Sequence, residues 1–124
     1  RFGNYSAESG FEAMKDLLRD KPYPTAVFAG NDTIAVGVMA AIQQQGLRIP
    51  EDIAVVGYDD IPIAAYTTPP LTTVRQSAHE SGELAGDMLI QLVRGEEPPE
   101  RRVRLEAELI IRDSCGASLR IDKR

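Results

Sequence analysis

The chain has 124 residues and a formal net charge of −5. This length suits one domain of ordinary size, and the acidic balance argues against a surface that grips nucleic acid, because such surfaces are basic. No apolar run approaches the ~20 residues that a membrane span needs. The single cysteine, Cys115, cannot form an internal disulfide, which fits a reducing compartment. The sequence starts at Arg1 rather than Met, so we expect that an upstream segment is missing.

The first half of the chain alternates helix and strand patterns. Ser6 is typical of the N-cap of a helix with one apolar face, and we expect that helix to end near Asp20. Residues 25–29 are short, apolar and β-rich, which predicts a buried strand. Asp32 is the predicted N-cap of a second helix, and Gly46 is its predicted C-terminal stop.

The alternation continues after the second helix. Residues 53–57 predict another buried strand, and residues 58–70 form a long loop with a short helical turn at 61–66. Residues 71–76 predict a third strand. Repeated strand, helix, strand patterns indicate βαβ units, so we expect an α/β fold with a parallel sheet.

The last third of the chain predicts one more helix and one more strand. Ser77 and Glu80 have the spacing of a capping box, and Gly95 ends the helix that follows. Residues 103–112 predict an edge or half-exposed strand, because apolar and polar side chains alternate from Val103 to Leu109. The tail from Asp113 offers little to bury, and we expect it to fray.

Polar pairs follow two of the predicted strands, Asn31-Asp32 and Asp59-Asp60. One βαβ unit separates them, so both pairs belong to the same edge of the sheet, where open α/β sheets bind ligands. A carboxylate accepts two donors at once, and an amide both donates and accepts. Asn31 and Asp59 therefore suit a ligand with neighbouring hydroxyls or amines, such as a sugar or a nucleoside.

Other interpretations compete at these positions. Asp and Asn after strands often only cap helices or form turns. We favour that role for Asp32 and Asp60, which directly precede helical stretches, and leave both roles open for Asn31 and Asp59. A Mg²⁺ site would need more oxygen ligands than the sequence offers here.

The sequence contains no phosphate-binding loop, no nucleophile motif and no Cys/His metal spacing. The single histidine, His79, falls in the first turn of a helix, where a surface position is expected. We therefore predict a binding protein rather than an enzyme, with no cofactor and no metal.

Three motifs occur together and in order: P-T-A-V-F-A-G-N-D at 24–32, R-I-P-E-D-I-A-V-V-G-Y-D-D at 48–60 and P-P-L-T-T-V-R-Q at 69–76. They resemble the LacI/GalR family of bacterial transcription regulators, and the resemblance covers most of the chain. It implies a three-layer αβα fold with a parallel sheet, periplasmic-binding-protein-like class I, of which this chain is a part.

The resemblance also implies how the chain is divided. Residues 1–76 and 102–114 would belong mainly to the C-terminal subdomain, and the helix within 77–98 to the N-terminal subdomain. The helix-turn-helix DNA-binding domain would be absent. The strand at 25–29, central in the family, would become an open sheet edge, and open edges invite pairing with another chain. We therefore expect self-association.

The implied function is effector sensing in a cytoplasmic LacI-type repressor. A small polar ligand, a sugar or a nucleoside, would control operator DNA binding allosterically. The family's effector contacts match Asn31 and Asp59, its aromatic position matches Tyr5, and a position at the cleft matches Gln76. The alternative is a periplasmic sugar-binding protein of a transport system.

The implied partners are the small-molecule effector, a second copy of the chain and operator DNA, with no membrane. The homodimer contact would lie near the helix that carries Ile34 to Val38 and near the loop around Tyr66. DNA would be contacted through the missing N-terminal domain and not through this part of the chain.

Overall fold

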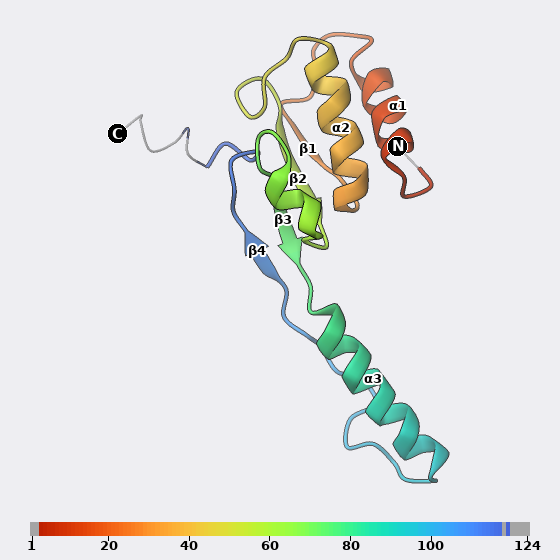
Figure 1. The fold of residues 1–124 in the computed structure, drawn as a ribbon. Helices are drawn as coiled ribbons and strands as arrows, with labels where there is room; N and C mark the ends of the chain where they lie inside the picture. Colours follow the sequence, from red (N-terminus) through yellow and green to blue (C-terminus); the bar gives the residue numbers. More distant parts are fainter. Residues whose placement is uncertain (1–2, 118, 120–124) are drawn as a thin grey trace. The chain divides into compact units, whose positions relative to one another are not determined.

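The structure is a computed structural model that describes residues 3–117 and 119. Its elements in chain order (Figure 1) are α1 (Ala7–Leu17), β1 (Ala26–Phe28), α2 (Asp32–Gln44), β2 (Ala54–Tyr58), the 3₁₀-helix η1 (Pro62–Tyr66), β3 (Thr72–Arg75), α3 (Ala78–Val93) and β4 (Glu108–Ile110). The described residues form two compact units, one running to Arg75 and resuming at Leu109, the other spanning Gln76–Glu108. None of the described helices is long and apolar enough to cross a membrane.

The sheet has the strand order β1-β2-β3-β4. β1 pairs parallel with β2 in the register Val27 to Val55, and β2 pairs parallel with β3 in the register Val56 to Thr72. The α/β fold with a parallel sheet is therefore confirmed. β1 lies at an edge of this sheet, as predicted, while self-association through that edge stays a prediction. The last strand is shorter than expected, because only Glu108–Ile110 of the alternating segment forms β4.

Two glycines allow α1 and α2 to pack closely side by side (Figure 1). A Cβ atom on Gly10 would overlap with the backbone carbonyl of Ile34, and one on Gly37 would overlap with the carbonyl of Ala7. Glycine is the residue that permits such backbone approach. The buried core between these helices and the sheet includes Met14, Leu18, Val38, Ala41, Ile42, Ile53, Val55 and Leu71.

The predicted helix boundaries are mostly confirmed, but the predicted cap of α2 is wrong. The Ser6 hydroxyl accepts a hydrogen bond from the Ser9 backbone at 3.1 Å and caps α1. Asn31, not Asp32, caps α2, since its Oδ1 accepts from the Ile34 backbone at 2.7 Å. The prediction of Asp32 as the cap is wrong because its side chain is turned into the interior, where other donors bind it.

α2 and α3 end just before Gly46 and Gly95, as predicted. These glycines have left-handed φ values of 72° and 76°. The start of α3 differs from the prediction. Ser77 precedes the helix, but its side chain makes no capping hydrogen bond, so the Ser77–Glu80 capping box does not form.

Ser114 is buried, contrary to our expectation that the tail from Asp113 frays, although Ile111 and Asp113 are exposed. The Ser114 hydroxyl donates to the Val55 carbonyl at 2.6 Å and accepts from the Thr72 backbone N–H at 2.8 Å. It therefore joins β2 to β3 just before their direct pairing begins. Residues 118 and 120–124 lie outside the described residues.

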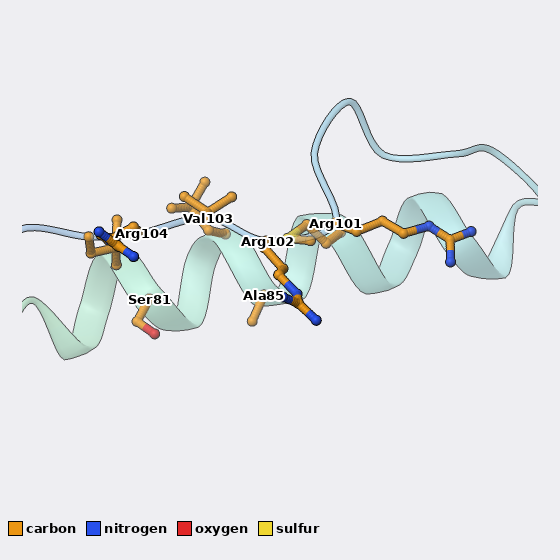
Figure 2. Close-up of a pocket in the computed structure, with 9 residues that line it drawn as sticks. Ser81, Ala85, Arg101, Arg102, Val103 and Arg104 are labelled. Carbon is orange, nitrogen blue, oxygen red and sulfur yellow. The ribbon is translucent and has the colours of Figure 1, made fainter.

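The second unit, Gln76–Glu108, consists of α3 and the chain that returns along it. No residue of α3 is buried. The segment Arg101–Leu105 and the α3 residues Leu84, Ala85 and Met88 line a shallow groove (Figure 2). The assignment of this helix to a separate N-terminal subdomain stays a prediction.

We expect Ser114→Ala to lower the free energy of unfolding by about 2 kcal/mol, because it leaves the Thr72 N–H and the Val55 carbonyl without this partner. Urea unfolding of the full-length protein measures the change. The control is Thr33→Ala at an exposed position of α2, which should change stability by no more than about 0.5 kcal/mol. Equal effects of the two substitutions would contradict the role of Ser114.

Candidate functional site

The residues predicted to bind a ligand follow the carboxyl ends of two paired parallel strands. Asn31 stands three residues after the end of β1, and Asp59 directly follows β2. The register pairs Phe28 with Val56, so the two strands end at the same edge of the sheet. Both side chains are half-buried. We call this edge, with Tyr5, Asn31 and Asp59, the rim.

Asn31 joins Tyr5 to the turn after β1. Its Nδ2 donates to the Tyr5 carbonyl at 3.5 Å, while its Oδ1 caps α2. The amide nitrogen carries two hydrogens, and the contact with Tyr5 uses one of them, so the second N–H can donate to a ligand. The Tyr5 side chain is 72% exposed. The structure thus joins Asn31 to the Tyr5 backbone, while Tyr5 itself is largely exposed.

Backbone strain is concentrated at the rim. Within the described residues, positive φ values at non-glycine positions occur at Tyr5 (65°), Asp59 (107°) and Asp60 (54°). Such conformations cost about 1–3 kcal/mol each and are retained where the surroundings enforce them, often at functional sites. The Asp59 N–H donates to the Val74 carbonyl at 2.8 Å, which holds the strained loop against β3.

Gln76 is the first residue of the second unit and is exposed. The other three predicted residues belong to the first unit. The contribution of Gln76 to the same site as these three residues therefore stays a prediction.

Asp32 is a buried structural carboxylate that the sequence interpretation missed. It is fully buried, its Oδ1 accepts from the Thr73 hydroxyl, and its Oδ2 accepts from the Ile61 N–H at 2.9 Å. A Cβ atom on Gly57 would overlap with this carboxylate. Asp32 thus ties the start of α2 to β3 and to the loop after β2, and the glycine within β2 makes room for it.

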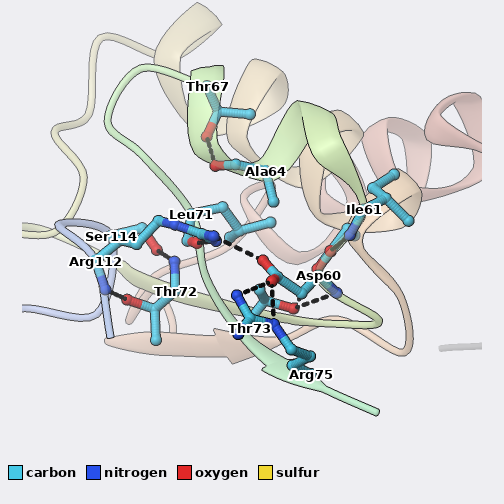
Figure 3. Close-up of polar contacts among 11 residues, drawn as sticks. Asp60, Ile61, Ala64, Thr67, Leu71, Thr72, Thr73, Arg75, Arg112 and Ser114 are labelled. Atoms are coloured by element: carbon cyan, nitrogen blue, oxygen red, sulfur yellow. Dashed lines mark hydrogen bonds and ion pairs between the residues drawn. The ribbon is translucent and has the colours of Figure 1, made fainter. Parts of the chain in front are cut away.

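Asp60 is also more than a turn residue, which corrects the sequence interpretation. Its side chain is only 8% exposed, and its two oxygens form ion pairs with Arg75 and Arg112 at 2.7 Å each (Figure 3). Burial raises the pKa of Asp60, but the hydrogen bonds and charges of Arg112 and Arg75 outweigh it, so the pKa lies below its usual range. Sequence spacing gave no signal for this cluster, because Arg112 is 52 residues away.

A groove of about 370 Å³ lies beside the open edge of β1. Tyr5 and Gly30 line it together with apolar residues of α1, β1 and α2, whereas Asn31 and Asp59 do not. It follows the exposed strand, where Phe28 is 64% exposed, and of the three rim residues it includes Tyr5 alone. Among the residues that the structure describes, no three His, Cys, Asp or Glu side chains gather where they could hold a metal ion.

A family model for the periplasmic binding protein-like domain matches residues 2–115. The chain belongs to this family. The ribose operon repressor of Escherichia coli K12 is 46% identical over 113 residues, which cover 91% of this chain and 34% of that protein. The HTH-type transcriptional repressor PurR of Vibrio vulnificus is 41% identical over 112 residues, 90% of this chain and 34% of that protein. The chain thus spans about a third of these relatives' length.

Solved structures agree. The lac repressor dimer bound to operator and the anti-inducer ONPF has a TM-score of 0.85 and 38% identity, covering 91% of this chain and 39% of that one. The complex of the transcriptional regulator CelR with cellobiose has a TM-score of 0.85 and 37% identity, covering 90% and 34%. The resemblance to the LacI/GalR family and to its periplasmic-binding-protein-like fold is confirmed.

We expect Gly57→Ala to lower the free energy of unfolding by about 1–3 kcal/mol, because the added methyl group displaces the Asp32 carboxylate from its buried partners. Gly30→Ala is the matched control, since a Cβ atom there meets nothing within 4 Å. Urea unfolding of the full-length protein compares them. A Gly57→Ala variant as stable as the control would mean that the Asp32 contacts do not contribute this much to the free energy of unfolding.

Asp60 should make stability depend on pH. Because its folded pKa lies below its unfolded value of about 3.9, its stabilisation is fully present only well above that value and is lost as the pH falls through the folded pKa. We expect Asp60→Asn to cost about 1–3 kcal/mol at pH 7 and clearly less near pH 3.

Urea unfolding at pH 7, 5 and 3 measures this change. Asp16→Asn, which removes an exposed ion pair with Arg19, should have a small effect throughout. A deficit for Asp60→Asn that is the same at pH 7 and pH 3 would be inconsistent with the lowered pKa.

Proposed function

We propose that the chain is the effector-sensing part of a LacI-type transcriptional repressor, which binds a small polar ligand through Tyr5, Asn31, Asp59 and Gln76. One observation carries the proposal. Asn31 and Asp59 follow the carboxyl ends of adjacent parallel strands, and Asn31 is bonded to Tyr5. The positive φ values at Tyr5 and Asp59 support it further.

The chemistry of the rim suits a sugar or a nucleoside. A carboxylate at Asp59 accepts two hydroxyl donors in charge-assisted bonds. The amide of Asn31 donates to a ligand oxygen, and the exposed ring of Tyr5 packs against an apolar ligand face. Among the relatives, one is named for the ribose operon, and two solved structures contain cellobiose or lactose, which favours a sugar.

The function would be regulation through binding and not catalysis. The relatives are named as repressors, which favours repression over the transport alternative, and a repressor acts in the cytoplasm, where its operator is. The ligand would shift the balance between arrangements of the parent protein by its difference in affinity for them. The lac repressor structure is a dimer. The predicted dimer contact at Tyr66 is accessible, since this side chain is 80% exposed.

Isothermal titration calorimetry of the full-length protein tests the proposal, with D-ribose, cellobiose, lactose and adenosine as probes. One of these should bind the unaltered protein, and Asp59→Ala should weaken that binding at least tenfold, about 1.4 kcal/mol. Asp16→Ala, which removes an exposed carboxylate on α1, is the matched control and should leave the Kd unchanged. An unchanged Kd for Asp59→Ala would remove Asp59 from the site, and no binding of any probe would reject this ligand class.

A further inference from the structure

Two stretches of chain join the two units, and near each of them the first unit carries an arginine that binds the same carboxylate. The chain leaves the first unit after Arg75, the last residue of β3, and re-enters it at Leu109. Arg112 stands two residues after the end of β4. Arg75 binds Asp60 Oδ2 through Nε and Nη2, and Arg112 binds Asp60 Oδ1 through Nη2, all at 2.7 Å. We call these two ion pairs the Asp60 bridge.

Further hydrogen bonds hold the Asp60 bridge to the first unit (Figure 3), in which Asp60 and Arg112 are largely buried and Arg75 is half exposed. Arg112 also donates from Nη1 to the Leu71 carbonyl at 2.8 Å, and its backbone N–H donates to the Thr72 hydroxyl at 2.8 Å. The Asp60 N–H donates to the Thr73 hydroxyl at 3.4 Å, and that hydroxyl is itself bonded to the buried Asp32. Every member of the bridge is thus attached to β3.

The same residue borders the rim. Asp59 and Asp60 are consecutive and both have positive φ values. Two arginines hold the Asp60 carboxylate. Because Asp59 is the preceding residue, holding Asp60 in place also fixes the position of the Asp59 backbone. The bridge therefore couples the loop that carries the predicted ligand carboxylate to both connecting stretches.

We propose that Asp60 is a positioning residue that fixes both connections between the units to the rim, so that ligand affinity depends on its charge although it does not touch the ligand. When two parts of a protein move relative to each other, a few residues at the ends of helices or strands take up the change in backbone angles. If the bridge is broken, both connections gain conformations, and the binding-competent fraction falls; apparent affinity falls with it. The affinity part of this proposal rests on the proposed function.

Hydrogen exchange of the full-length protein tests the bridge without any ligand. Asp60→Asn should speed exchange in both connecting stretches, residues 74–78 and 108–113, at least fivefold more than in β2, whose amides report the loss of global stability. Arg112→Gln should also speed exchange at residues 74–78, because the two arginines communicate through Asp60. Arg48→Gln removes the exposed Arg48–Asp52 ion pair and should change neither stretch.

Two outcomes would overturn the bridge as a shared anchor. In one, Arg112→Gln affects only its own stretch of chain. In the other, Asp60→Asn speeds exchange in the two stretches by no more than in β2, as a loss of global stability alone would. If Asp60→Asn does not fold, Arg75→Gln replaces it, since the Arg75 side chain is 51% exposed and should be tolerated; its effect is then read at residues 108–113.

Calorimetry with D-ribose separates this proposal from the proposed function. Asp60→Asn should weaken binding at least fivefold, and Asp60→Glu, which keeps the charge, should recover most of it. An unchanged Kd for Asp60→Asn together with a loss of binding for Asp59→Ala would reject the positioning role and keep the site. The expected exchange pattern without any D-ribose binding would reject D-ribose as the effector and keep the Asp60 bridge.

Discussion

A single buried carboxylate holds together the edge of the sheet at which the predicted ligand-binding residues lie. Asp32 accepts from the Thr73 hydroxyl and from the Ile61 N–H, and so joins the start of α2, β3 and the loop after β2. An unpaired carboxylate in this position would be strongly unfavourable, and these donors compensate its loss of water. Within the described residues, no buried side-chain nitrogen or oxygen lacks a hydrogen-bond partner. The loop that carries Asp59 is therefore attached to a fixed support.

The rim shows how a scaffold can hold strain where a ligand would bind. Tyr5, Asp59 and Asp60 have positive φ values, and each lies beside bonds that enforce the conformation: Asn31 to the Tyr5 carbonyl, the Asp59 N–H to β3, and the two arginines to Asp60. Strain that the structure enforces in this way keeps polar groups preorganised, which lowers the cost of ordering them when a ligand arrives.

Much of the fold and part of the candidate site could be predicted from the sequence. Alternating strand and helix patterns predicted the parallel sheet, and the positions of Asn31 and Asp59 after two strands predicted their common edge. The second residue of each polar pair was misjudged. Asp32 and Asp60 each precede helical stretches, which is typical of caps, but their partners Thr73, Arg75 and Arg112 come from strands far along the chain.

The sequence by itself determined the elements, their order and the edge of the sheet at which polar side chains gather, because hydrophobic periodicity and glycine stops are local properties. Only the tertiary structure decided which carboxylates are buried and what binds them. The capping box at Ser77 shows the same limit, since the spacing is present but the bond is not. Ion pairs and buried hydrogen bonds join residues 40 or more positions apart, and no local pattern encodes which of them meet.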